Sequence, residues 1–172
     1  MRRGQVVAVE TLIVTVAIIL VSTIIATYII VVSLQARSQP EVDVLGVNSV
    51  QFVNEDGSMF EIVIEVSVYS RGTVESRLDV ITLFDRSGSV DLNLASATHP
   101  AGTDLYIITS GSATYYVELK NFDGRVLEPF SSSTILITVE ASSNPYVGGV
   151  SYLGILTFNN YFTWFQYTPL ET

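Results

Sequence analysis

The 172-residue sequence contains no cysteine and only one histidine, His99. Without cysteine there is no disulfide, no thiol nucleophile and no cysteine-ligated metal. A single histidine excludes a multi-histidine metal centre, and a catalytic triad would have to be built around His99, in the loop-like segment SATHPAGTD. Neither a Walker loop nor a GxGxxG fingerprint occurs. The sequence therefore gives no basis for an enzyme, and we expect no cofactor and no bound metal.

Basic residues are also scarce in most of the chain. After Pro40 there are five basic and sixteen acidic residues, a net charge of −11. A strongly acidic surface repels nucleic acid and anionic lipid. We therefore expect no nucleic-acid partner.

Charge is missing altogether from one long segment near the N-terminus. From Thr11 to Ala36 there are 26 consecutive residues without a charged side chain, whereas about 20 apolar residues are enough to cross a bilayer. The run is longer than the apolar core of a cleaved secretory signal peptide. Arg2 and Arg3 precede it, and basic residues beside a span tend to stay cytoplasmic. We expect this segment to insert in the membrane and the rest of the chain to face outside.

The first residues read MRRG followed by QVVAVETLIVTVAIIL, and this stretch resembles the class III signals of the archaeal type IV pilin and archaellin superfamily. The resemblance implies that a prepilin peptidase cuts after Gly4, so that Gln5 becomes the mature N-terminus. It also implies that the hydrophobic helix becomes the filament core. Many pilins carry glutamate as the fifth mature residue; here Glu10 would be the sixth.

Glu10 has two interpretations on physical grounds. A carboxylate in apolar surroundings is costly unless it is paired, and the new α-amino group of a neighbouring subunit could pair with it, which would make Glu10 an assembly residue. Alternatively, Glu10 lies at the level of the lipid headgroups near the start of a helix, where the helix dipole favours negative charge.

Small side chains recur along the apolar segment at intervals of three, four and seven residues. Such spacing places them on one stripe of a helix, where small residues let apolar helices approach closely. The alternative is a lone membrane anchor with incidental serine and threonine. The predicted helix-packing stripe consists of Ala8, Thr11, Thr15, Ser22, Ala26 and Ser33.

Beyond Pro40 the pattern changes from helical spacing to alternation. Proline cannot continue a helix, so we place a domain boundary at residue 39, with a leader and hydrophobic helix over 1–39 and a head domain over 40–172. In MFEIVIEVSVY, alternate residues from Phe60 to Val68 are apolar, which is typical of a half-buried strand. Further strands are predicted at VDVLGVNSVQFV, LDVITLF, VDLNL, LYIIT, TYYVEL, STILITVEA, VSYLGILTF and YFTWFQY. The chain is thus predicted to be α+β: a long N-terminal hydrophobic α-helix followed by an antiparallel immunoglobulin-like β-sandwich.

The last predicted strand is unusually aromatic. Alternation places Phe162 and Trp164 on one face and Phe165 and Tyr167 on the other. One face belongs in the domain's own core, and the second suggests contact with a neighbouring subunit, because large apolar surface is seldom left exposed. A loop covering the outer face is the alternative. These four residues are our candidate subunit-contact aromatics.

Together these features favour a structural subunit of an extracellular, type IV pilus-like filament, either an adhesion pilus or an archaellum. Its expected partners are further copies of itself, the prepilin peptidase, the membrane assembly machinery and, before assembly, the membrane. We expect a membrane-inserted precursor and then an extracellular filament on the cell surface. The alternative is a single-span membrane-anchored β-sandwich binding module, such as an accessory archaellum component that binds the S-layer. That alternative predicts an uncut leader and a finite oligomer.

Overall fold

The computed structural model describes the backbone of residues 3–37, 41–53, 59–159 and 161–171, and the side chains of 14–33, 41–53, 59–159 and 161–170. The chain divides into two compact units, Met1–Ser38 and Gln39–Thr172. We describe each unit by itself and call the second unit the head.

The first unit is one helix, α1 (Arg3–Arg37). Its 35 residues correspond to a length of about 50 Å at 1.5 Å per residue. Val14–Ser33 has a mean hydropathy of 2.6 and is long and apolar enough to cross a membrane, a property that signal sequences share. The Thr23 hydroxyl donates to the Ile19 carbonyl and the Thr27 hydroxyl to the Thr23 carbonyl, each at 2.8 Å. Both hydroxyls are therefore satisfied within the helix and need no water in an apolar environment.

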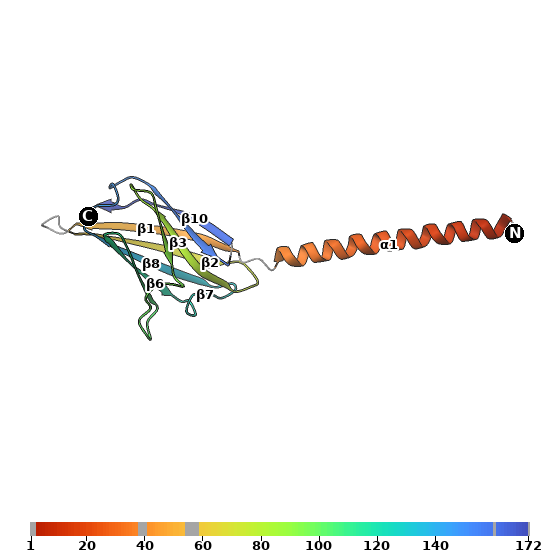
Figure 1. Cartoon of the computed structure of the whole chain (residues 1–172), viewed down its shortest axis with the longest axis horizontal. Coiled ribbons are helices and arrows are strands. Elements are labelled where there is room, and N and C mark those ends of the chain that lie inside the picture. Colours follow the sequence, from red (N-terminus) through yellow and green to blue (C-terminus); the bar gives the residue numbers. More distant parts are fainter. Residues whose placement is uncertain (1–2, 38–40, 54–58, 160, 172) are drawn as a thin grey trace. The chain divides into compact units, whose positions relative to one another are not determined.

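The head is built from strands in two sheets (Figure 1). One sheet has the order β11-β1-β2-β8-β6-β5 and the other β10-β9-β3-β4, with β7 paired to β3. Neighbouring strands run antiparallel, except for the short parallel pair of β1 and β11. The strands are β1 (Val42–Val53), β2 (Phe60–Ser70), β3 (Ser76–Phe84), β4 (Ser89–Asn93), β5 (Leu105–Ser110), β6 (Ala113–Lys120), β7 (Val126–Leu127), β8 (Ser132–Ala141), β9 (Tyr152–Phe158), β10 (Tyr161–Tyr167) and β11 (Leu170–Glu171).

One hydrophobic core lies between the sheets. In β2 the side chains of Ile62, Ile64 and Val66 are fully buried, whereas Glu61 and Glu65 alternate with them and are exposed. Ile62, Ile64 and Val66 belong to the same buried cluster as residues of β3, β6, β8 and β9. Because the sequence has no cysteine, the head is stabilised by burial of this apolar surface and not by disulfides.

The predicted fold class is confirmed: an apolar N-terminal helix is followed by a β-sandwich. The two-residue strands β7 and β11 were not predicted, because a pair of residues is too short to show alternation. The predicted boundary at residue 39 lies outside the described residues. Gly4 and Gln5 lie within the backbone of α1, and the side chains of Ala8, Glu10 and Thr11 lie outside the described part of the chain.

Candidate functional sites

The first candidate site is the surface of α1. Within this chain the side chains of Val14–Ser33 are exposed, including the large ones. Ile24, for example, is 66% exposed. Four members of the predicted stripe lie in this range, and one of them, Ser22, borders a shallow groove with Val14, Ala17, Ile18 and Val21. The four are Thr15, Ser22, Ala26 and Ser33. The helix therefore presents a small-residue face that another helix could approach closely.

The second candidate site is an exposed apolar surface on the outer face of β9 and β10, which we call the aromatic patch: Leu153, Ile155, Phe162 and Trp164. Phe162 and Trp164 are 65% and 64% exposed. Trp164 lies directly opposite Ile155 in the β9–β10 ladder. The two faces predicted for this strand are therefore real, and the outer face is not covered by a loop within the described residues.

The inner face of β10 is the face that belongs to the head's own core, and it carries two of the four candidate contact aromatics. Phe165 and Tyr167 are each only 2% exposed and belong to the head's own core. They are not available for a subunit contact, so the four candidate contact aromatics reduce to Phe162 and Trp164. The sequence could not show which of the two faces is buried, because both carry large aromatic side chains.

The aromatic patch lies in a long uncharged part of the head. No charged residue occurs between Glu140 and Glu171, and β9 and β10 fall wholly within this interval. The outer face of the other sheet instead carries carboxylates, among them Glu61 and Glu65 on β2. Two copies of a head with net charge −11 repel one another, and this repulsion is smallest where the approaching surfaces carry no charge.

Tyrosines are packed behind the patch. Tyr146 and Tyr167 are each 2% exposed, their rings meet edge to face with centroids 5.7 Å apart, and the Tyr167 hydroxyl donates to the Phe84 carbonyl at 2.7 Å. Burial raises the pKa of both phenols well above the usual value, and the carboxylate of Asp85 adds to this effect. These phenols therefore stay neutral at physiological pH, and their role is to pack in the core of the head.

His99 is held by its neighbours in the head. Its ring stacks on Tyr106 with centroids 4.6 Å apart, and its Nδ1 lies 3.0 Å from the Leu105 carbonyl oxygen. Since a carbonyl can only accept, Nδ1 is the donor. In the described part of the chain, no group of three or more His, Asp and Glu side chains could hold a metal ion. These contacts give His99 a role in fixing its loop.

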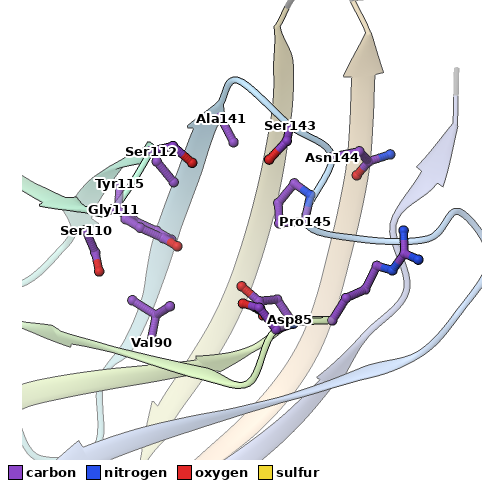
Figure 2. A pocket seen from close by; sticks show the side chains of 13 residues that line it. Asp85, Val90, Ser110, Gly111, Ser112, Tyr115, Ala141, Ser143, Asn144 and Pro145 are labelled. Atoms are coloured by element: carbon purple, nitrogen blue, oxygen red, sulfur yellow. Dashed lines mark hydrogen bonds between the residues drawn. The ribbon is translucent and has the colours of Figure 1, made fainter.

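The third candidate site is a cleft of about 590 Å³ at one end of the sandwich, which we call the loop-end cleft. Its lining comes from 85–87 and Val90, from 110–113 and Tyr115, and from Ala141 with 143–145. Figure 2 shows Asp85, Ser112, Ser143 and Tyr115 around the central space. The sequence marks turns near these segments, but only the pairing of the strands brings the three segments together.

Comparisons with known proteins assign no family. No protein-family model matches the chain, and a search of curated proteins found no match. The pilin and archaellin resemblance therefore rests on the N-terminal residues alone.

Proposed function

We propose that this protein is a structural subunit of an extracellular, type IV pilus-like filament of the archaeal pilin and archaellin superfamily. After cleavage behind Gly4, α1 would leave the membrane and pack against copies of itself in the filament core. The heads would form the outer surface, and the subunit would act by burial and shape rather than by catalysis.

One observation carries the proposal: a 35-residue helix whose apolar stretch Val14–Ser33 is not buried against any part of the chain that the structure describes. A length of about 50 Å is more than the roughly 30 Å of bilayer hydrocarbon requires. Apolar side chains exposed on all sides must be covered by lipid or by other helices. A filament core would cover the whole length of the helix and would use the small-residue stripe for close contact.

The head adds a second argument. The aromatic patch is apolar, exposed and uncharged, and tight packing of heads in a filament would cover it. A contact of this kind needs no disulfide and avoids the repulsion between acidic heads.

The deciding experiment is N-terminal sequencing and intact-mass measurement of material sheared from the surface of native cells. We expect high-molecular-weight filaments whose subunits begin at Gln5. A chain that keeps Met1 and is recovered only from detergent extracts as a small oligomer would contradict the proposal.

A single-span, membrane-anchored binding module is the second candidate function. The observation that favours it is the loop-end cleft, because β-sandwiches often bind ligands with the loops at one end. In this case α1 would remain a membrane anchor with an uncut leader, and the same mass measurement separates the two functions.

A further inference from the structure

The loop-end cleft is held open by hydrogen bonds within its own loops. Oδ1 of Asp85 accepts from the Ser87 backbone N–H at 2.7 Å, from the Ser87 hydroxyl at 2.6 Å and from the Gly88 N–H at 3.0 Å. The Arg86 N–H donates to the Pro145 carbonyl at 3.2 Å and so ties two of the loops together. The cleft is therefore preformed, which lowers the entropic cost of binding a ligand.

A tyrosine that is largely buried directs its hydroxyl into the cleft. Tyr115 is only 3% exposed, and Figure 2 shows its hydroxyl directed into the space in front of Asp85. Within the described residues this hydroxyl makes no hydrogen bond. A phenolic hydroxyl that faces a cleft can donate a hydrogen bond to a ligand atom and accept one from it. The Tyr115 hydroxyl thus marks a position where a polar ligand atom would be stabilised.

Further polar groups surround this position at the rim. The hydroxyls of Ser112 and Ser143 point toward the cleft in Figure 2, and neither is engaged elsewhere in the part of the chain that the structure describes. Oδ2 of Asp85 is likewise unengaged there, because the loop bonds use Oδ1. The hydroxyls of Tyr115, Ser112 and Ser143 can therefore both donate to and accept from a ligand, and Oδ2 of Asp85 can accept.

The remaining lining restricts the class of ligand. Val90, Ala113 and Pro145 provide apolar surface beside the polar groups. A metal ion would find only one carboxylate, with the cationic Arg86 among the lining residues. A small anion would meet Asp85 in a head of net charge −11. A neutral ligand that presents hydroxyls next to C–H groups would match the polar groups and the apolar side chains of the lining. A sugar ring has this chemistry.

We propose that the loop-end cleft binds a neutral saccharide unit, with the Tyr115 hydroxyl and Asp85 as its principal hydrogen-bonding groups. This site goes beyond the proposed filament function, because either a filament subunit or an anchored module would present it outside the cell. Loss of sugar binding should leave the length and yield of filaments unchanged. A failure of the saccharide proposal can therefore be distinguished from a failure of the filament proposal.

The test uses the full-length chain in lauryldimethylamine oxide, a detergent without a sugar headgroup. Glucose, mannose, galactose and N-acetylglucosamine are offered one at a time, and binding is measured by saturation-transfer NMR and titration calorimetry. We expect saturable binding of at least one sugar. Tyr115→Phe, which removes only the hydroxyl, should weaken it about tenfold, and Ser143→Ala should weaken it in the same direction.

The matched control is Tyr116→Phe on the same strand. The Tyr116 hydroxyl donates to Glu140 at 3.2 Å on the outer face of the sheet, so its removal should not change sugar affinity. Thermal unfolding of each variant checks that the head is folded. The proposal is overturned if none of the sugars binds, or if folded Tyr115→Phe and Ser143→Ala variants both bind as tightly as the unchanged protein.

Discussion

Gly154 lies directly opposite the buried Phe165 in the β9–β10 ladder. The Phe165 ring lies over the glycine, so that any added Cβ would overlap the ring. An aromatic ring placed over a glycine fills the space that a side chain would otherwise take and shields the backbone. At this position the requirement for glycine is therefore steric, and it does not depend on a positive φ.

We expect Gly154→Ala to destabilise the head by about 1–3 kcal/mol, because the Phe165 ring or the strand must move to admit the methyl group. The measurement is the free energy of unfolding from urea titration of the full-length chain. Gly46→Ala is the control, since a Cβ at Gly46 meets nothing within 4 Å. Equal losses of stability in the two variants would contradict the steric explanation.

The buried phenols of Tyr146 and Tyr167 predict how stability depends on pH. Their pKa values are raised above the ordinary 10.0, mainly by burial. Above pH 10 the unfolded chain loses these protons while the folded head retains them, so the free energy of unfolding should be constant below that pH and fall above it. Urea titrations at a series of alkaline pH values measure this.

Tyr167→Phe serves as the comparison in the same titrations. It should cost about 1 kcal/mol at neutral pH, because the bond to the Phe84 carbonyl is lost, and it should make the alkaline decline shallower. A free energy of unfolding that stays flat above pH 10 in the unchanged protein would refute this account.

Two elements that carry candidate sites, α1 and β10, expose apolar surface of a kind usually covered. In α1 the exposed side chains extend over the whole described range, Val14–Ser33. In β10 they are confined to one face, because the opposite face belongs to the core. The apolar side chains of the helix therefore require lipid or other helices on all sides, whereas the strand requires a neighbouring molecule only on its outer face.

For α1 we expect Ala26→Phe to reduce filament yield strongly. A large side chain on the small-residue stripe prevents close approach, and a loss of about 1–2 kcal/mol per helix contact weakens association roughly 5- to 30-fold. Ile25→Phe is the control, because it enlarges a neighbouring position outside the stripe. Filaments sheared from cells are quantified by electron microscopy, and membrane fractions show that both variants insert. Equal yields from the two variants would exclude the stripe as a packing face.

For β10 we expect Trp164→Ser to weaken association between heads by about tenfold or more, because exposed aromatic residues contribute most where they are buried on assembly. The fold should persist, since Trp164 is 64% exposed. Leu45→Ser is the control, at a residue that is 62% exposed on β1. Analytical ultracentrifugation and the yield of sheared filaments measure the effect, and indistinguishable results for the two variants would argue against the patch.

At the scale of the whole molecule, the charge is distributed unevenly. The head carries a net charge of −11, whereas the interval between Glu140 and Glu171 carries none. Four of the five basic residues of the head form ion pairs with carboxylates: Arg71, Arg77, Lys120 and Arg125. These pairs are largely exposed and contribute little to stability, but they leave a surface that is predominantly acidic.

This distribution predicts that self-association strengthens with salt. Salt screens the repulsion between acidic heads over a Debye length of about 10 Å at 0.1 M and about 3 Å at 1 M, while a contact through an apolar patch is not weakened by screening. Sedimentation of the full-length protein in detergent at low and high sodium chloride measures the change. Dissociation at high salt would indicate that ion pairs, and not the aromatic patch, hold the copies together.

The sequence by itself determined the helix and the longer strands of this protein, but not the two-residue strands β7 and β11. The 26-residue uncharged run specified a helix able to cross a membrane, and the alternation from Phe60 to Val68 specified a half-buried strand. The predicted strands VSYLGILTF and YFTWFQY correspond to β9 and β10, which pair through Phe158 and Tyr161. Such features follow from local periodicity and turn chemistry, which are properties of neighbouring residues.

Only the tertiary structure decided which surfaces remain exposed. Periodicity separated the two faces of β10 without indicating which one is buried, and the packing of the sheets placed Phe165 and Tyr167 inside and left Phe162 and Trp164 outside. The loop-end cleft likewise joins Asp85, Tyr115 and Ser143. These residues lie on separate connections and strands, and strand order, which depends on contacts between distant parts of the chain, brings them together.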